Sequence, residues 1–379
     1  MTRAQKNFAY QGAALLVTFA AVALVAATAS ANLEDRGIEL GTDFLSDRAG
    51  FTLSESWLTY SPDDSNLWAL AVGIGNTLVV AALVALFSTA IGTILGILRM
   101  SDNPLGAAFA RSWVEIARNS PPILLLLFLY SFLGQVLPVS SVVEPVPGTF
   151  LSLRGLALPW IDLGVHGWTA GAAAALSVAI LVLVGKATAA RQRASGQRPK
   201  WLLAAFVGLG LAWVSAIIFW LVPVASINRP EADGADITGG VILTPEFFTL
   251  IAGLTFYTSG FVAEIVRTGL QSVTRGQWEA AAALGLSKAR TLRLVVIPQM
   301  LRVIIPPMTS QYINVVKNST LVIAIGYADF MVVAGTVINK TSHAIEGTAI
   351  IIAVYLAINL TLSALMNAIN RRIQQNPRT

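Results

Sequence analysis

A short polar stretch between two apolar segments has the residue types of a helix that docks on another protein. Glu279 precedes four consecutive alanines, and Gly285 and Pro298 follow. Alanine forms helices most readily, and glycine tolerates the left-handed conformation that ends many helices. Small side chains would let a helix at 278–284 settle into a groove on a second protein, while the Glu279 carboxylate fixes its register. Such a contact binds a partner rather than performing catalysis. Its expected residues are Glu279, Ala280, Ala281, Gly285, Leu286 and Pro298.

A second short helix is expected after the turn at Gly285. Ser287 is placed to cap this helix, which should run through Arg290 to Val296, and Pro298 opens the next apolar span. The alternative interpretation of the whole stretch is an ordinary amphipathic surface loop.

A lysine inside the following apolar span is the second candidate for chemistry. At 1.5 Å per helical residue, Lys317 lies roughly 22 Å beyond Arg302, past the centre of a bilayer. A charge there is costly unless it is paired or hydrated. One hypothesis is a helix break near Lys317 that lets polar side chains receive a solute carboxylate in a central cavity. The alternatives are an ion pair with an internal acid such as Asp329, or packing against a partner subunit. The candidates for this pathway are Lys317, Asn318, Ser319, Thr320, Tyr257 and Ser259.

Other polar residues in the apolar spans have simpler interpretations. Tyr257 and Ser259 could line the same pathway or only bond neighbouring backbone. Glu264 with Arg267, and Glu115 with Arg118, have the i,i+3 spacing of structural ion pairs along one helix. The sequence contains no cysteine and two histidines, which excludes disulfides and thiol nucleophiles and leaves too few ligands for a histidine metal cluster. We expect no metal site and no enzyme activity in this chain.

The composition places these residues in a membrane protein. The chain has 379 residues, of which 55% are hydrophobic and 12% charged, and its mean hydropathy is +0.69. Soluble domains carry about 25% charged residues. The formal net charge of +5 does not indicate nucleic-acid binding, because the basic residues are distributed among loops as a membrane topology requires.

The apolar segments predict an all-α, polytopic protein of about eight transmembrane helices. A spanning helix needs about 20 apolar residues, and the spans centre near residues 22, 84, 129, 174, 213, 255, 315 and 358. Lys and Arg accumulate in cytoplasmic loops. Segments 32–66 and 225–246 are acid-rich, whereas 186–200, 264–302 and the C-terminal tail are basic. Both termini are therefore predicted in the cytoplasm. The first span also imitates a secretory signal, with Ala29-Ser30-Ala31 as a cleavage site, but its apolar run is longer than usual and favours a retained helix.

Four regions follow from this pattern. Residues 1–66 form an N-terminal helix and an acidic periplasmic loop, and 67–137 begin a core. Residues 138–243 form an inserted helical hairpin with ordered external loops, and 244–379 complete the core with a cytoplasmic loop at 264–302.

The spacing of the Glu279 stretch resembles the EAA loop of binding-protein-dependent ABC importers. Segments 257–277, 298–307 and 317–330, together with 75–78 and 114–119, are similar to the polar amino-acid subfamily of these permeases, over about 67–137 and 244–370. The longer layout resembles the first permease of the general L-amino-acid and glutamate/glutamine/aspartate/asparagine importers. This resemblance implies a type I permease core with an extra N-terminal helix and an inserted hairpin, in the bacterial inner membrane.

The resemblance also implies the partners and the function. The partners would be a second permease, two ATP-binding subunits and a periplasmic amino-acid-binding protein. The inserted hairpin suggests that the two permeases differ and form a heterodimer. ATP and magnesium would bind the ATPase partner, because no G-x-x-x-x-G-K-[ST] loop is present here. Two other classes fit less well. An ion-coupled secondary transporter would need acids within its spans, and a membrane enzyme would need a catalytic cluster.

Overall fold

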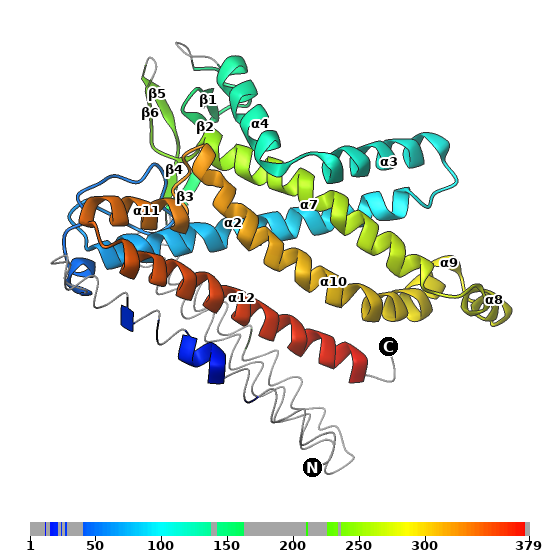
Figure 1. The fold of residues 1–379 in the computed structure, drawn as a ribbon. Helices are drawn as coiled ribbons and strands as arrows, with labels where there is room; N and C mark the ends of the chain where they lie inside the picture. The colour runs from blue at the N-terminus through cyan, green and yellow to red at the C-terminus, as the bar shows by residue number, and fades with distance from the viewer. Residues whose placement is uncertain are drawn as a thin grey trace. The chain divides into compact units, whose positions relative to one another are not determined.

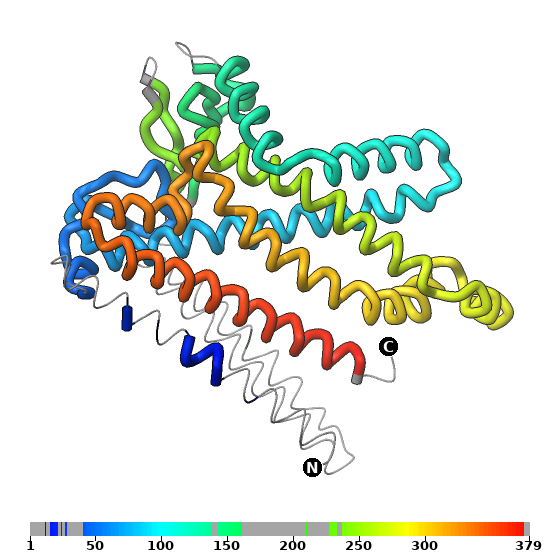
Figure 2. The backbone as a smooth tube through the Cα atoms, in the orientation of Figure 1, coloured from blue at the N-terminus to red at the C-terminus, as the bar shows by residue number. Residues whose placement is uncertain are grey.

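The computed structural model describes residues 41–137, 142–162, 226–233 and 236–375, together with positions 12, 16–21, 24, 27, 28 and 210. The chain divides into two compact units, one made of Met1–Leu126 and Leu250–Thr379 and the other of Leu127–Thr249. Each is treated by itself. Figures 1 and 2 trace the chain from its N-terminal to its C-terminal end.

The first unit is helical (Figure 1). A 3₁₀ turn at Asp43–Leu45 precedes the long helices, and a π-helical segment at Leu292–Val296 and a 3₁₀ segment at Ser319–Ala324 flank α10. The α-helices, including two shared with the second unit (α4 and α7), are α2 (Asn66–Leu98), α3 (Pro104–Asn119), α4 (Pro122–Val136), α7 (Pro245–Gln271), α8 (Arg275–Ala283), α9 (Lys288–Thr291), α10 (Ile297–Asn318), α11 (Phe330–Thr341) and α12 (Ala344–Gln375).

Four of the described helices are long and apolar enough to cross a membrane. They are α2, α7, the continuous helix Lys288–Ala324 and α12. The pair α3 and α4, which is sharply bent at the break between its helices, would make a fifth span if both parts belong to one crossing. These helices match the predicted spans near residues 84, 255, 315, 358 and 129. The predicted spans near 22, 174 and 213 are centred outside the described residues.

Glycines allow α7 to approach its neighbours closely. A Cβ atom at Gly92 of α2 would lie 2.6 Å from the Val262 side chain of α7, and one at Gly269 of α7 would overlap Ile304 of α10. Small residues at such crossings are typical of helix packing in membranes, where backbones gain contact by close approach. The same helices share two apolar clusters around Val262 and Ala263. This packing fixes the polar end of α7 that carries Glu264.

The segment before α2 packs against α11. Phe44 and Ala49 join Leu70 of α2 and Phe330 and Val333 of α11 in one buried cluster. Lys340 of α11 also donates to the main-chain carbonyls of residues 48 and 49. The described part of the predicted acidic loop, residues 41–65, therefore packs on the helices of this unit.

The second unit contains short antiparallel strands in the segments that we expected to be ordered loops. β1 (Phe150–Ser152) pairs with β2 (Gly155–Leu158), and β2 pairs with β7 (Val241–Leu243). β3 (Trp160–Asp162) pairs with β4 (Ser226–Asn228), and β5 (Glu231–Asp233) with β6 (Asp236–Thr238). Strands on the two sides of residues 163–225 thus pair with each other. The predicted hairpin between them lies outside the described residues, except for Gly210.

Candidate functional site

The expected docking stretch folds as a helix, a tight turn and a second helix. Gly285 has φ +69°, and its N–H donates to the Ala282 carbonyl at 2.9 Å. The next N–H, of Leu286, reaches back to the carbonyl of Ala281 at 3.1 Å. These two bonds form a Schellman motif, which closes the C-terminal end of α8. The predicted left-handed glycine is confirmed. We call residues 275–291, which contain α8, the turn and α9, the elbow.

The elbow exposes an apolar and charged surface. Ala281 is buried, whereas Glu279, Ala280 and Gly285 are exposed. Leu284 has 78% of its surface exposed and Trp278 has 37%. Glu279 makes no ion pair with any residue in the described part of the chain. A partner protein can reach this surface. Exposed apolar side chains such as Leu284 and Trp278 favour binding, because a contact removes them from water.

The second helix of the elbow differs from the prediction. Ser287 occupies the N-cap position, but its side chain makes no capping hydrogen bond. The helix does not stop at Val296, because the π-helical segment carries it into α10, which has Pro298 in its first turn as predicted. Single π-helical turns often occur at functional positions. The elbow is therefore continuous with a membrane-spanning helix, so a displacement of α9 moves α10 directly.

Lys317 lies on an exposed polar stripe of α10. Ser310, Asn314 and Lys317 are all exposed, and their spacing places them on one face of the helix. Only Lys317 was identified from the sequence. The signal for the other two is their recurrence every three or four residues in an otherwise apolar span. Polar side chains at this depth face protein or a hydrated cavity rather than lipid.

The chain changes helix type directly after Lys317. α10 ends at Asn318 and a 3₁₀ segment begins at Ser319, so the helix type changes near the expected break, but the chain stays helical to Ala324. The Ser319 hydroxyl is buried and donates to the Val316 carbonyl at 2.9 Å, and the Thr320 hydroxyl donates to the Lys317 carbonyl at 2.7 Å. Asn318 is half-buried. These bonds give the Val316 and Lys317 carbonyls a side-chain donor at the point where the helix type changes.

Asp329 is not the partner of Lys317 in this structure. Its Oδ1 accepts from the Val332 N–H at 2.9 Å and so caps α11. No carboxylate within the described segments lies within ion-pair distance of Lys317. The structure therefore leaves a charged side chain on an exposed face and gives no support to the internal ion pair.

The two candidates in α7 have different surroundings. The Ser259 hydroxyl is fully buried, donates to the Phe256 carbonyl at 2.7 Å and lies 2.9 Å from the donating Nε1 of Trp113 in α3. This geometry favours the backbone-bonding alternative for Ser259. Tyr257 is half-buried and its ring contacts that of Phe261, with centroids 5.0 Å apart.

Asn76 and Thr77 have a role that the sequence did not reveal. Both are fully buried in α2. The Asn76 amide donates to the carbonyls of Ala328, at 2.7 Å, and Glu55, at 3.0 Å, and the Thr77 hydroxyl accepts from the Phe330 N–H at 2.9 Å. Together they join the segment before α2 to the turn before α11. Only the resemblance to permeases singled out these residues, because nothing local in the sequence predicts their tertiary partners.

Burial raises the pKa of Asp329 to about 7, although the N–H groups of Val332 and Met331 oppose the shift by bonding the carboxylate. A raised pKa means that the folded state binds a proton more tightly than the unfolded state. The contribution of Asp329 to the free energy of unfolding is therefore complete below the pKa that the carboxyl has in the unfolded state, near 4. That contribution is lost as the pH rises through 7. The loss is on the order of 2 kcal/mol between pH 5 and 7, at about 1.4 kcal/mol per pH unit.

We expect Asp329→Asn to remove this pH dependence while keeping the cap, since asparagine is an equally good N-cap residue. Midpoints of heat denaturation for the purified chain, measured from pH 5 to pH 7, test this. The parent should fall relative to the variant as pH rises. Parallel curves would show that Asp329 does not titrate in this range.

A cluster of arginines surrounds Glu264 near the end of α7. The carboxylate pairs with Arg267 on its own helix and with Arg99 at the end of α2. Arg118 of α3 lies 3.9 Å away from the same carboxylate and stacks over the Phe261 ring at 5.5 Å. The predicted pair of Glu264 and Arg267 is confirmed. The predicted pair of Glu115 and Arg118 is wrong, because Arg118 turns to Glu264 on another helix and Glu115 is exposed.

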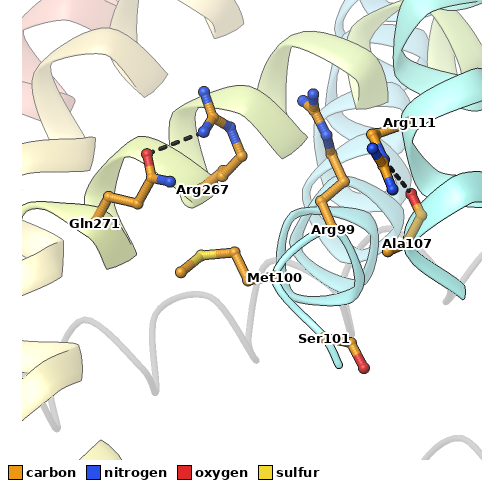
Figure 3. Close-up of a pocket in the computed structure, with 7 residues that line it drawn as sticks. All are labelled: Arg99, Met100, Ser101, Ala107, Arg111, Arg267 and Gln271. Carbon is orange, nitrogen blue, oxygen red and sulfur yellow. Dashed lines mark hydrogen bonds between the residues drawn. The ribbon is translucent and has the colours of Figure 1, made fainter. Parts of the chain in front are cut away.

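A basic cavity lies beside this cluster (Figure 3). Its volume is about 470 Å³. Its lining residues come from the end of α2, the following turn, α3 and α7, and are Arg99, Met100, Ser101, Ala107, Arg111, Arg267 and Gln271. Arg267 donates to the Gln271 amide oxygen at 3.0 Å, and Arg111 donates through Nε to the Ala107 carbonyl at 3.2 Å. Three guanidinium groups thus meet at one cavity that no carboxylate lines.

These features define a class of protein. The structure combines several apolar helices with a polar stripe on α10 and an exposed elbow that is joined to the same helix. This combination is that of a membrane transport subunit. Among the described residues, no group of three histidine or acidic side chains could hold a metal ion.

The chain belongs to the family of binding-protein-dependent transport system inner membrane components, which its residues 88–375 match. It is 43% identical over 348 residues to the putative amino-acid ABC transporter permease protein YhdX of Escherichia coli strain K12, covering 90% of this chain and 87% of that protein. It is 38% identical to the general L-amino acid transport system permease protein AapQ of Rhizobium johnstonii, covering 97% and 92%. It is also 35% identical to the glutamate/glutamine/aspartate/asparagine transport system permease protein BztB of Rhodobacter capsulatus, covering 98% and 95%.

Among solved structures, the crystal structure of an amino acid ABC transporter with histidines is similar, with 22% identity and a TM-score of 0.49. That match covers 81% of this chain and 94% of the other.

Proposed function

We propose that this chain is the permease subunit of an ATP-driven amino-acid importer. The observation that carries the proposal is the exposed elbow, in which a Schellman turn joins α8 to α9 and α9 continues without a break into the membrane helix α10. A partner that closes and opens on this elbow would move α10 and thereby its polar stripe. The similar proteins are permeases of amino-acid transport systems, which supports amino acids as the solute, with polar L-amino acids or a broader L-amino-acid range as the two choices.

The assembly would contain four kinds of protein. A second permease pairs with this one, two ATPase subunits bind ATP and magnesium, and a periplasmic binding protein delivers the solute. Residues Glu279, Ala280, Ala281, Gly285, Leu286 and Pro298 would form or position the ATPase contact. The chain itself would bind no cofactor. Both termini would lie in the cytoplasm, as the basic loops indicate.

Uptake of labelled amino acids by the reconstituted complex tests the function. Proteoliposomes should contain this chain, its sister permease and the ATPase, with the binding protein outside. Uptake that requires ATP and the binding protein supports the proposal. Uptake by this chain alone, driven by an ion gradient, would contradict it.

Lys317 would receive the carboxylate of the solute from the exposed face of α10. A hydrogen bond to a charged group contributes about 1.5–3 kcal/mol, so Lys317→Ala should raise the KM for uptake about tenfold or more. Arg371→Ala removes one positive charge at an exposed position near the end of α12 and should leave KM unchanged. Unaltered affinity and rate in Lys317→Ala would reject the carboxylate role.

A further inference from the structure

The basic cavity has unused hydrogen-bond donors. Arg99 and Arg267 both contact Glu264, and Arg111 uses its Nε for the carbonyl of its own helix (Figure 3). Within the described segments, the two terminal nitrogens of Arg111 have no hydrogen-bond partner. The other nearby acids, Asp102 and Glu115, are exposed and do not line the cavity. The cavity therefore presents positive charge and free donors to whatever enters it.

The helix that carries Arg111 has two opposite apolar faces. Ala107, Ala110, Val114 and Ala117 are buried. On the other side, Leu105, Phe109 and Ile116 have 82%, 56% and 58% of their surfaces exposed, and their spacing places them in one stripe. Because α3 runs along α7, with Ala110 and Val114 against Ala263 and Val114 and Ala117 near Gly260, its outer stripe faces acyl chains or an apolar partner.

Arg111 lies on the flank between these two faces of α3, because successive helical residues turn by about 100°. Arg111 lies about two turns after the start of α3, which follows directly after the end of the α2 span, so its long side chain reaches toward the level of the lipid headgroups. The mouth of the cavity would then open where phosphates are concentrated. Guanidinium groups bind phosphate oxygens through paired hydrogen bonds, and basic pockets between membrane helices on the cytoplasmic side bind anionic headgroups.

We propose that this cavity binds the phosphate of an anionic phospholipid in the cytoplasmic leaflet. The proposal rests on the proposed function for the side of the membrane, because the elbow at the end of α7 defines that side. A bound headgroup would connect α3 to the ends of α2 and α7, next to the Glu264 cluster. It would thus stabilise the helix ends that lead into the elbow.

Native mass spectrometry of the purified full-length chain in its complex tests the binding. Samples are prepared from membranes containing phosphatidylglycerol and phosphatidylcholine. The parent should retain phosphatidylglycerol in preference to phosphatidylcholine. Arg111→Gln should weaken that retention about fivefold, the effect expected of one basic residue at an anionic surface. Arg371→Gln removes the same charge from an exposed site outside the cavity and should behave as the parent does.

Two further arms separate the lipid from other ligands. Millimolar inorganic phosphate should not displace the lipid, and displacement would overturn the proposal in favour of a small-anion site. Equal retention by the parent and Arg111→Gln would overturn it, as would loss of the ATPase subunit from Arg111→Gln without any change in bound lipid. Uptake measured on the same samples separates this inference from the function. Absent uptake with Arg111-dependent lipid retention would reject the function and preserve the lipid site.

Discussion

Replacing Gly285 by valine should reduce uptake by about tenfold or more while the protein still inserts into the membrane. The residue has φ +69°, and a conformation of this kind costs a non-glycine residue roughly 1–2 kcal/mol, with β-branched residues the least tolerant. The open space around the position excludes a steric clash as the cause, because an added Cβ would meet nothing within 4 Å. The expected loss therefore comes from the turn. Without the Schellman bonds, α8 would leave the position that we propose for the ATPase contact.

Two matched variants isolate this effect. Gly285→Asn should retain most uptake, because asparagine visits the left-handed region more readily than other residues. Gly276→Ala adds a methyl group in open space within α8 and should be neutral. Reversing the charge by Glu279→Lys should also uncouple ATP hydrolysis from transport. Uptake and ATPase activity are measured together in proteoliposomes. Gly285→Val complexes that transport at the parental rate would contradict the role of the elbow.

Replacing Glu264 by glutamine should destabilise the bundle more than any single change among the basic residues around it. The carboxylate is contacted by Arg267, Arg99 and Arg118 from three helices. Removing one partner of a buried ion pair costs about 3–5 kcal/mol, because it leaves uncompensated charge. The side chain of Glu264 is 25% exposed, so we expect about 3 kcal/mol, the low end of that range.

Heat denaturation of the purified chain measures this loss. Glu115→Gln is the matched control, because Glu115 is exposed and forms no ion pair with the described residues. The double variant Glu264→Gln with Arg99→Gln should recover part of the stability, since it removes one of the unpaired charges. Equal denaturation midpoints for Glu264→Gln and Glu115→Gln would show that the arginine cluster contributes nothing.

Local chemistry made the elbow predictable from sequence. The alanine run, Gly285 and Pro298 each act within one turn of helix, so their effects do not depend on distant residues. The continuity of α9 with α10 was missed. The turn between the two helices is marked by glycine, but no residue between Ser287 and Pro298 forces a break, and a π-helical turn accommodates the change instead.

Tertiary partners could not be read from spacing along one helix. The i,i+3 rule found Arg267 for Glu264 but assigned Arg118 to Glu115, because the competing carboxylate belongs to α7. Asn76 likewise bonds carbonyls 21 and 252 residues away. The strands of the second unit were missed because segments of three or four residues are too short to show an alternating pattern.

The side of the membrane on which the elbow lies tests the account most directly. The chain has no cysteine, so a single cysteine can be introduced at exposed Gly276 in the elbow or at exposed Thr52 before α2. Labelling is done with a membrane-impermeant maleimide in intact cells and in inverted vesicles. We predict that Gly276→Cys reacts only in inverted vesicles and is protected there by the ATPase, while Thr52→Cys reacts only in intact cells. Labelling of Gly276→Cys in intact cells would contradict the account.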